Sequence, residues 1–359
     1  MPGNLQDKKI LLILILFIIF FINAEKLFAN PSIEEIYPGA VFLMIYPGAR
    51  QVGMAGAFTG IADDAFATYY NPAGLALQKN INLSFLQSHW LSGLYPDMRY
   101  YMGNLILPVS EIMMGLSWIY LSTGETEVWD ENGNYLGEYT PYDMAPAISV
   151  GKKISDYLAV GGTVKYIYSY LVPDWVFRAM PELGIERGGT GEAFALDVGT
   201  LLSVSTFGKT SLGLVIQNIG YGIKYTQSGE GDPLPSAIKF GISQKILLKD
   251  LLKQKSNNLF IDYLQESSKL IIAYDFYRSL VNRRYFWQSV GTEICFAPIA
   301  FRFGYFSDPH GERKGRTIGF GIDFDYLQIN VASDADIYEF GTENLRYDLS
   351  LKLPDKIKF

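Results

Sequence analysis

The residues best suited to chemistry lie near the N-terminus, in the stretch ADDAFATYYNPAGLA from Ala62 to Ala76. Its adjacent carboxylates, Asp63 and Asp64, could serve an acid–base reaction or bind calcium. Calcium loops of the EF-hand type, however, spread their oxygen ligands over about twelve residues. Two neighbouring acids do not supply such a set. These carboxylates are therefore predicted to cap a helix or to pair with a cation inside the protein.

Other catalytic signatures are scarce. The chain has two histidines, His89 and His310, and it has no Gly-x-Ser-x-Gly elbow, phosphate-binding glycine loop or His-Glu metal helix. His89 precedes Trp90, and this pair is expected in an aromatic belt at a membrane interface. His310 is expected in an external loop. The sequence thus predicts no enzyme, no metal site and no cofactor.

The N-terminus has the layout of a secretory signal peptide. Two lysines precede an apolar run at residues 10–22, and small residues follow at Ala24 and Ala29. A membrane anchor is the alternative, but a bilayer span needs about 20 apolar residues, more than this run provides. We therefore expect export, with residues 1–29 as the signal peptide.

The composition narrows the class of exported protein. A net charge of -7 provides no basic face for nucleic acid, and a single cysteine, Cys295, excludes an intrachain disulfide framework. Aromatic residues make up 15% of the chain, which also has 35 glycines and no second long apolar run. These features are typical of an outer-membrane β-barrel. A soluble periplasmic β-protein is the alternative.

Alternation with period two is the main structural signal. In residues 158–170 the even positions are mostly apolar or aromatic and the odd positions are mostly small or polar, and the same pattern recurs in 194–205, 317–324 and 345–353. Successive side chains of a strand point to opposite faces, so each segment has one apolar and one polar face. The sequence predicts an all-β fold, a 14-stranded antiparallel transmembrane β-barrel, with strands near 81–88, 97–107, 112–122, 139–151, 157–171, 192–205, 210–219, 235–247, 268–277, 285–296, 299–306, 316–325, 326–333 and 345–353.

The connections between these strands alternate in length. Long connections, such as 123–138 and 172–191, follow odd-numbered strands, whereas short ones, such as 152–156 and 206–209, follow even-numbered strands. Short periplasmic turns opposite long external loops are typical of outer-membrane barrels. This parity places both ends of the barrel in the periplasm.

One long connection, residues 248–267, falls on the predicted periplasmic side. Leucines at 247, 248, 251 and 252 have helical spacing. The segment is interpreted as a solvated helical connection or as a docking element for a periplasmic partner.

The region before the first strand is predicted to lie inside the barrel, residues 81–359. Residues 30–80 lack strand alternation and are rich in Ala, Gly and Met, and a barrel of more than eight strands has room that its own side chains do not fill. Pro72 prevents a helix from running through this segment, because it lacks a donor and restricts the residue before it. Residues 30–80 are therefore expected to form an N-terminal lumenal hatch.

Charged residues also mark the predicted lumen. By alternation, these side chains point inward, where charge is tolerated better than on the lipid face. They are expected to pair with one another or to hold the hatch, and they are Asp197, Asp275, Glu293, Arg302, Asp323, Arg346, Asp348 and Lys352.

The segment GARQVGMAGAFTGIADDAFATYYNPAGLA, residues 48–76, resembles the N-terminal motif of the PorV/PorQ proteins and their FadL-like relatives. Later segments agree, including IQNIGYG at 216–222, LPSAIKFGIS at 234–243, VGTEICFAPIAFRFGYF at 290–306 and GFGIDF at 319–324. The resemblance implies a fourteen-stranded outer-membrane barrel with a hatch. The motif residues, with structural or gating roles, are Arg50, Gly53, Gly56, Asp63, Asp64, Asn71, Pro72 and Gly74.

The resemblance also implies a location and a set of partners. The cell outer membrane is the expected location, with its lipid around the barrel. PorV-like members bind secreted cargo together with components of type IX secretion, which makes protein secretion or cargo handling the leading hypothesis. FadL-like members pass hydrophobic small molecules such as fatty acids through the barrel wall, which is the second hypothesis. A soluble periplasmic β-scaffold is the third.

Overall fold

The computed structural model describes residues 36–353 apart from 181–187, 227–230, 253–257, 283–284, 309–312, 325, 338–340 and 343. The predicted signal peptide, residues 30–35 of the predicted hatch and His310 lie outside the described residues. None of the helices in the described ranges combines the length and apolar character needed to cross a membrane.

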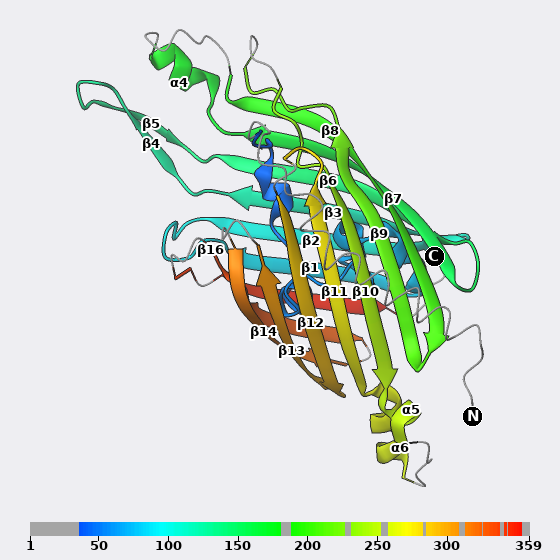
Figure 1. Ribbon diagram of the computed structural model, residues 1–359. Helices are drawn as coiled ribbons and strands as arrows, with labels where there is room; N and C mark the ends of the chain where they lie inside the picture. Colours follow the sequence, from blue (N-terminus) through cyan, green and yellow to red (C-terminus); the bar gives the residue numbers. More distant parts are fainter. Residues whose placement is uncertain are drawn as a thin grey trace.

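Fourteen antiparallel strands form a closed barrel (Figure 1), which confirms the predicted fold class. The first strand pairs with the last, from Ile81 opposite Leu353 to Ser88 opposite Arg346, and this pairing closes the sheet. The barrel strands are β1 (Ile81–His89), β2 (Arg99–Val109), β3 (Ile112–Ser122), β6 (Tyr142–Lys153), β7 (Leu158–Tyr170), β8 (Thr190–Thr206), β9 (Gly208–Gly220), β10 (Ala237–Leu247), β11 (Lys269–Ser279), β12 (Phe286–Phe296), β13 (Ile299–Ser307), β14 (Arg313–Asp323), β15 (Leu327–Ser333) and β17 (Leu345–Leu353).

The alternation of the sequence becomes an alternation of burial. In β1, Leu83 and Phe85 are exposed on the outer face, whereas Ser84 and Leu86 are buried on the inner face. Neighbouring aromatic rings stack along the outer face, with ring centroids of Phe85 and Tyr101 6.0 Å apart. An apolar outer face and a polar, filled inner face suit a barrel surrounded by lipid.

The two ends of the barrel differ, and we call them the long-loop end and the short-turn end. Between β3 and β6, at the long-loop end, a separate hairpin of β4 (Thr126–Trp129) and β5 (Tyr135–Tyr139) occupies a connection in which no strand was predicted. Helix α4 (Asp174–Ala179) lies at the same end, and the short strand β16 (Asp336–Ile337) pairs with β14. Helices α5 (Leu248–Leu252) and α6 (Leu259–Ser267) project from the short-turn end (Figure 1).

The position of Trp90 differs from the predicted aromatic belt. It does not join an outer aromatic belt, because it packs against the buried core, and the Arg346 guanidinium carbon lies 4.8 Å from the centroid of its ring. The strand ends at His89, so the alternation of faces no longer dictates the direction of the next side chain.

Residues 36–80, here called the interior segment, lie within the barrel (Figure 1) and contribute many of its fully buried side chains. Small residues and prolines keep its elements short. These elements are η1 (Val41–Met44), α2 (Ala49–Gly53), α3 (Ala67–Tyr70) and η2 (Pro72–Leu77).

Candidate functional site

The interior segment runs from one end of the barrel to the other. At the long-loop end, the Gly39 amide donates to the Pro233 carbonyl at 2.9 Å. At the short-turn end, the segment leads into β1 at Ile81. A single pass through the lumen therefore brings the segment into contact with strands from all around the wall.

A buried charged group, here called the anchor cluster, joins this segment to the wall. The Arg50 guanidinium donates to Glu293 on β12 at 2.7 and 3.1 Å. It also donates to Asp63 at 2.6 Å and to Asp64 at 2.9 Å. Glu293 in turn accepts a hydrogen bond of 2.8 Å from Arg302 on β13. One arginine thus links both carboxylates of the opening motif to the barrel wall.

The two adjacent carboxylates have different environments. Burial alone would raise the pKa of Asp63, but Arg50 and Lys245 outweigh it and hold that pKa below its usual range. Burial raises the pKa of Asp64, against the attraction of Arg50. Asp64 also accepts from the Phe66 amide at 3.0 Å. Both side chains therefore meet a cation, and Asp64 also meets a backbone donor.

Wall carboxylates hold the backbone of the interior segment as well. Asp348 on β17 accepts from the amide of Ala49, the first residue of α2, at 2.5 Å, where a negative charge is favourable. Asp275 on β11 accepts from the amides of Phe58 and Thr59 at 3.1 and 2.8 Å. These bonds satisfy backbone donors that would otherwise be buried without partners.

Glycines on the inner wall let the segment approach closely. A Cβ atom at Gly304 would lie 2.5 Å from the Ala55 nitrogen, and one at Gly241 would lie 2.6 Å from the Gly60 nitrogen. Real Cβ atoms do not come so near to backbone. We call this set the glycine belt; its members are Gly115 on β3, Gly151 on β6, Gly161 on β7, Gly199 on β8, Gly213 on β9, Gly241 on β10, Gly291 on β12, Gly304 on β13 and Gly319 on β14.

The remaining motif residues shape the segment itself. Asn71 accepts from the Ala73 amide at 3.1 Å and donates to carbonyl groups of Thr59 and Thr200 at 3.0 Å. Pro72 opens η2, where its missing donor is harmless.

The motif glycines occupy tight positions. Gly53 packs on Gly319 of the wall, Gly74 lies against Ala62, and Gly56 lies beside the Tyr46 ring with a φ of 78°, a conformation that glycine adopts without strain.

The other predicted lumen charges pair within the wall. Asp197 lies 2.8 Å from the Lys165 ammonium on β7, and Asp323 lies 3.9 Å from Lys352 near the short-turn end. Arg346 donates to Ser88 at 2.7 Å and to Asp334 at 3.0 Å. The predicted charges therefore form separate groups rather than one selective ring.

The sequence did not predict an aromatic cage around Lys239, a residue of β10. The Lys239 ammonium lies 4.9 Å from the ring centroids of Tyr46 and Tyr69, and 5.7 Å from those of Tyr70 and Tyr277. Such cation–π contacts are worth about 2 kcal/mol when desolvated. Lys239 has the same alternation parity as Gly241 on β10, which could have identified it as inward-facing.

Within the described ranges, no three His, Cys, Asp or Glu side chains gather in a way that could hold a metal ion. What the site can do follows from its geometry: it fixes a plug of buried backbone to the wall through ion pairs, carboxylate–amide bonds and direct backbone contact.

Solved structures share this fold. The crystal structure of the Ralstonia pickettii toluene transporter TbuX has a TM-score of 0.54 and 14% identity, over 86% of this chain and 98% of that chain. The crystal structure of the P. putida toluene transporter TodX has a TM-score of 0.55 and 13% identity, over 86% of this chain and 98% of that chain. At these identities the likeness shows the fold alone. No curated protein sequence matches this chain.

The sequence profile of a family described as "Type IX secretion system protein PorV" matches residues 29–266. This match covers more than half of the chain, including the interior segment and strands β1 to β10. The protein therefore belongs to the PorV family of outer-membrane β-barrels.

Proposed function

We propose that this barrel acts in type IX protein secretion as a closed scaffold, which binds secreted cargo or secretion components through its long-loop end. The observation that carries the proposal is the interior segment, which is bonded to the wall and packed against it. A scaffold needs a stable barrel and an exposed binding face, and it needs no open lumen.

The contacts of the interior segment argue against an axial channel. Moving the segment aside would separate Arg50 from Glu293, both buried, and would break the bonds from Asp275 and Asp348 to backbone amides. Removing one partner of a buried ion pair usually costs about 3–5 kcal/mol. Several such losses would have to occur together for the segment to leave.

The long-loop end offers a binding face outside the barrel. The β4–β5 hairpin projects there (Figure 1), and it exposes Trp129 and Tyr135, whose ring centroids lie 5.2 Å apart. Exposed Trp and Tyr on a hydrogen-bonded hairpin are suited to protein contacts, because such residues are enriched in interfaces.

Secretion in the native host tests this function. Deleting the gene should leave type IX cargo inside the cells, and the wild-type gene should restore cargo outside them. A photoreactive residue in place of Trp129 or Tyr135 should then crosslink to the same cargo or to a secretion component. A photoreactive residue in place of Tyr326, which is exposed in the short turn between β14 and β15, is the matched control.

Normal secretion in the deletion strain would exclude the proposal. The second candidate is passage of hydrophobic small molecules, which the shared fold with the toluene transporters TbuX and TodX favours. Faster uptake of labelled toluene or fatty acid by cells making the wild-type barrel, with secretion unchanged, would support that candidate instead.

A further inference from the structure

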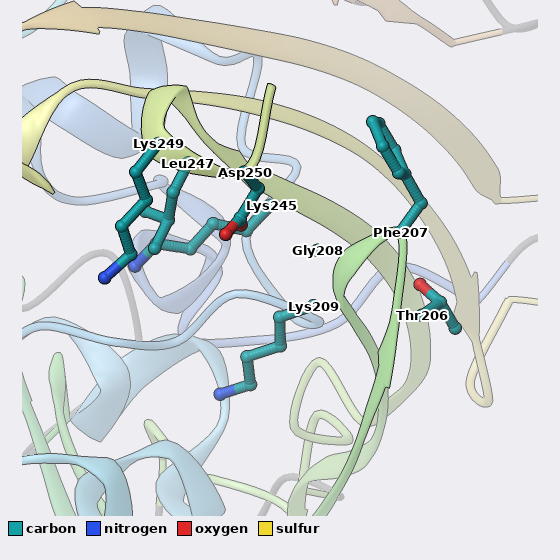
Figure 2. A pocket seen from close by; sticks show the side chains of 8 residues that line it. All are labelled: Thr206, Phe207, Gly208, Lys209, Lys245, Leu247, Lys249 and Asp250. Carbon is teal, nitrogen blue, oxygen red and sulfur yellow. The ribbon is translucent and has the colours of Figure 1, made fainter. Parts of the chain in front are cut away.

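A cavity of about 790 Å³ opens at the short-turn end (Figure 2), where its lining residue Lys245 adjoins Asp63 of the anchor cluster. It lies between the turn that joins β8 to β9, the end of β10 and the start of α5. Its lining residues are Thr206, Phe207, Gly208, Lys209, Lys245, Leu247, Lys249 and Asp250.

Positive charge dominates this cavity. Three lysines from three different elements line it, Lys209 on β9, Lys245 on β10 and Lys249 on α5, against a single carboxylate, Asp250. Figure 2 shows Lys245 and Lys249 extending toward the same side of the cavity. Lys245 has a partial partner, because its ammonium lies 3.8 Å from Asp63.

The other two lysines are farther from a carboxylate than Lys245 is. Among the residues that the structure describes, neither Lys209 nor Lys249 makes an ion pair with a carboxylate. A smaller adjacent cavity of about 170 Å³ shares Lys209 and adds Lys153. Neighbouring like charges repel one another, so an anion at this place would relieve the repulsion.

The cavity faces the aqueous side of the barrel end. One wall is the base of the α5–α6 extension, which projects beyond the strands (Figure 1). The Leu248 amide donates to the Ser268 carbonyl at 2.9 Å, so the two ends of this extension meet beside the cavity. Short turns mark the periplasmic end of an outer-membrane barrel, which places the cavity in reach of periplasmic proteins.

The size and lining of the cavity indicate its ligand. Cavities of about 300–1,000 Å³ hold molecules of drug or short-peptide size, more than a single phosphate fills. Phe207 and Leu247 add apolar surface beside the lysines. We propose that this cavity binds a carboxylate-rich peptide segment of a periplasmic protein, with Lys209, Lys245 and Lys249 as the carboxylate contacts. This proposal does not rest on the type IX function.

The test uses the full-length barrel in nanodiscs of neutral phosphatidylcholine. The probe is a fluorescein-labelled octapeptide of six glutamates, one leucine and one phenylalanine, and binding is measured by fluorescence anisotropy. We expect binding that weakens as salt is raised. Lys209→Gln and Lys249→Gln should each weaken it about 2- to 5-fold, and the double variant Lys209→Glu/Lys249→Glu should weaken it by about 10-fold or more.

Lys152→Gln is the matched control. Lys152 lies at the same end, is exposed and pairs with Glu111 at 2.8 Å outside both cavities, so its loss should leave binding unchanged. Heat-modified gel mobility checks that each variant is folded; Lys249 lies on an exposed helix outside the barrel. Lys245 is left intact because it also contacts the interior segment.

Two results would overturn the proposal. Equal weakening by Lys152→Gln and Lys249→Gln would mean general attraction to a basic surface. Absence of peptide binding in neutral nanodiscs, with lysine-dependent retention of phosphatidylglycerol instead, would assign the lysines to a lipid headgroup.

Discussion

The Arg50 guanidinium donates two hydrogen bonds to the Glu293 carboxylate, of 2.7 Å from Nε and 3.1 Å from Nη2, although 243 positions separate the two residues. Both side chains are almost fully buried. This pair joins the interior segment to β12, and we expect the stability of the filled barrel to depend on it.

Arg50→Met should lower the free energy of unfolding by about 3–5 kcal/mol, because it leaves Glu293 buried beside fewer cations. Urea unfolding of the refolded barrel measures the effect. The exposed pair of Lys152 and Glu111 supplies the control, since Lys152→Met should cost less than about 1 kcal/mol. An Arg50→Met/Glu293→Gln double variant should lose less free energy of unfolding than the two single variants lose together. Strictly additive losses would contradict a direct interaction between the two side chains.

Gly304→Ala should loosen the interior segment. The added Cβ would lie 2.5 Å from the Ala55 nitrogen, and overpacking of this kind costs about 1–3 kcal/mol. The lower urea midpoint should be accompanied by faster protease cleavage within residues 36–80. Gly103→Ala on β2 is the matched control, because its Cβ would meet nothing within 4 Å. Equal sensitivity of both variants would show that close packing of the segment is not responsible.

Tyr46→Phe should destabilise the barrel by about 1–3 kcal/mol, because the Trp287 indole N–H would lose its acceptor at 2.7 Å inside the protein. Thermal unfolding followed by tryptophan fluorescence measures this loss. Tyr135→Phe removes a hydroxyl that donates to Glu138 on the exposed hairpin and should leave the unfolding temperature unchanged. An unchanged unfolding temperature in Tyr46→Phe would mean that the Trp287 indole N–H finds another acceptor.

Asp63 and Asp64 should respond oppositely to acid. The pKa of Asp63 is lowered in the folded protein, so its stabilising effect is present above its ordinary value of about 3.9 and is lost as the pH falls below it. The pKa of Asp64 is raised, so its protonation favours the folded state on acidification. Urea unfolding measures the free energy of unfolding as the pH is lowered from 6 to 3. The difference in this free energy between wild type and Asp63→Asn should shrink. The difference between wild type and Asp64→Asn should change in favour of wild type.

Replacing residues 249–266 by a short Gly-Ser turn should leave the barrel folded. Leu248 and Ser268 are already hydrogen-bonded across the base of this extension at 2.9 Å, so a short connection can join β10 to β11. Heat-modified gel mobility and the urea midpoint should match those of the wild type. Failure of the variant to insert into membranes would assign the extension a role in folding.

The sequence by itself determined the strands, because alternation of faces is a local property of extended backbone. Every barrel strand lies within a few residues of its predicted range. The inward direction of Glu293 and Arg302 followed from the same parity, and leucine spacing predicted the helix Leu248–Leu252. The β4–β5 hairpin was missed because a short hairpin outside the barrel alternates too briefly to be recognised.

Only the tertiary structure decided what the inward residues touch. Parity shows that Glu293 points inward but not that Arg50 meets it, since that contact depends on how fourteen strands close and where the interior segment crosses the lumen. The glycine belt could not be predicted from the sequence either, because each of its glycines occupies one inner-facing position of a different strand. Local geometry sets the face of a side chain, whereas closure of the barrel sets its partner.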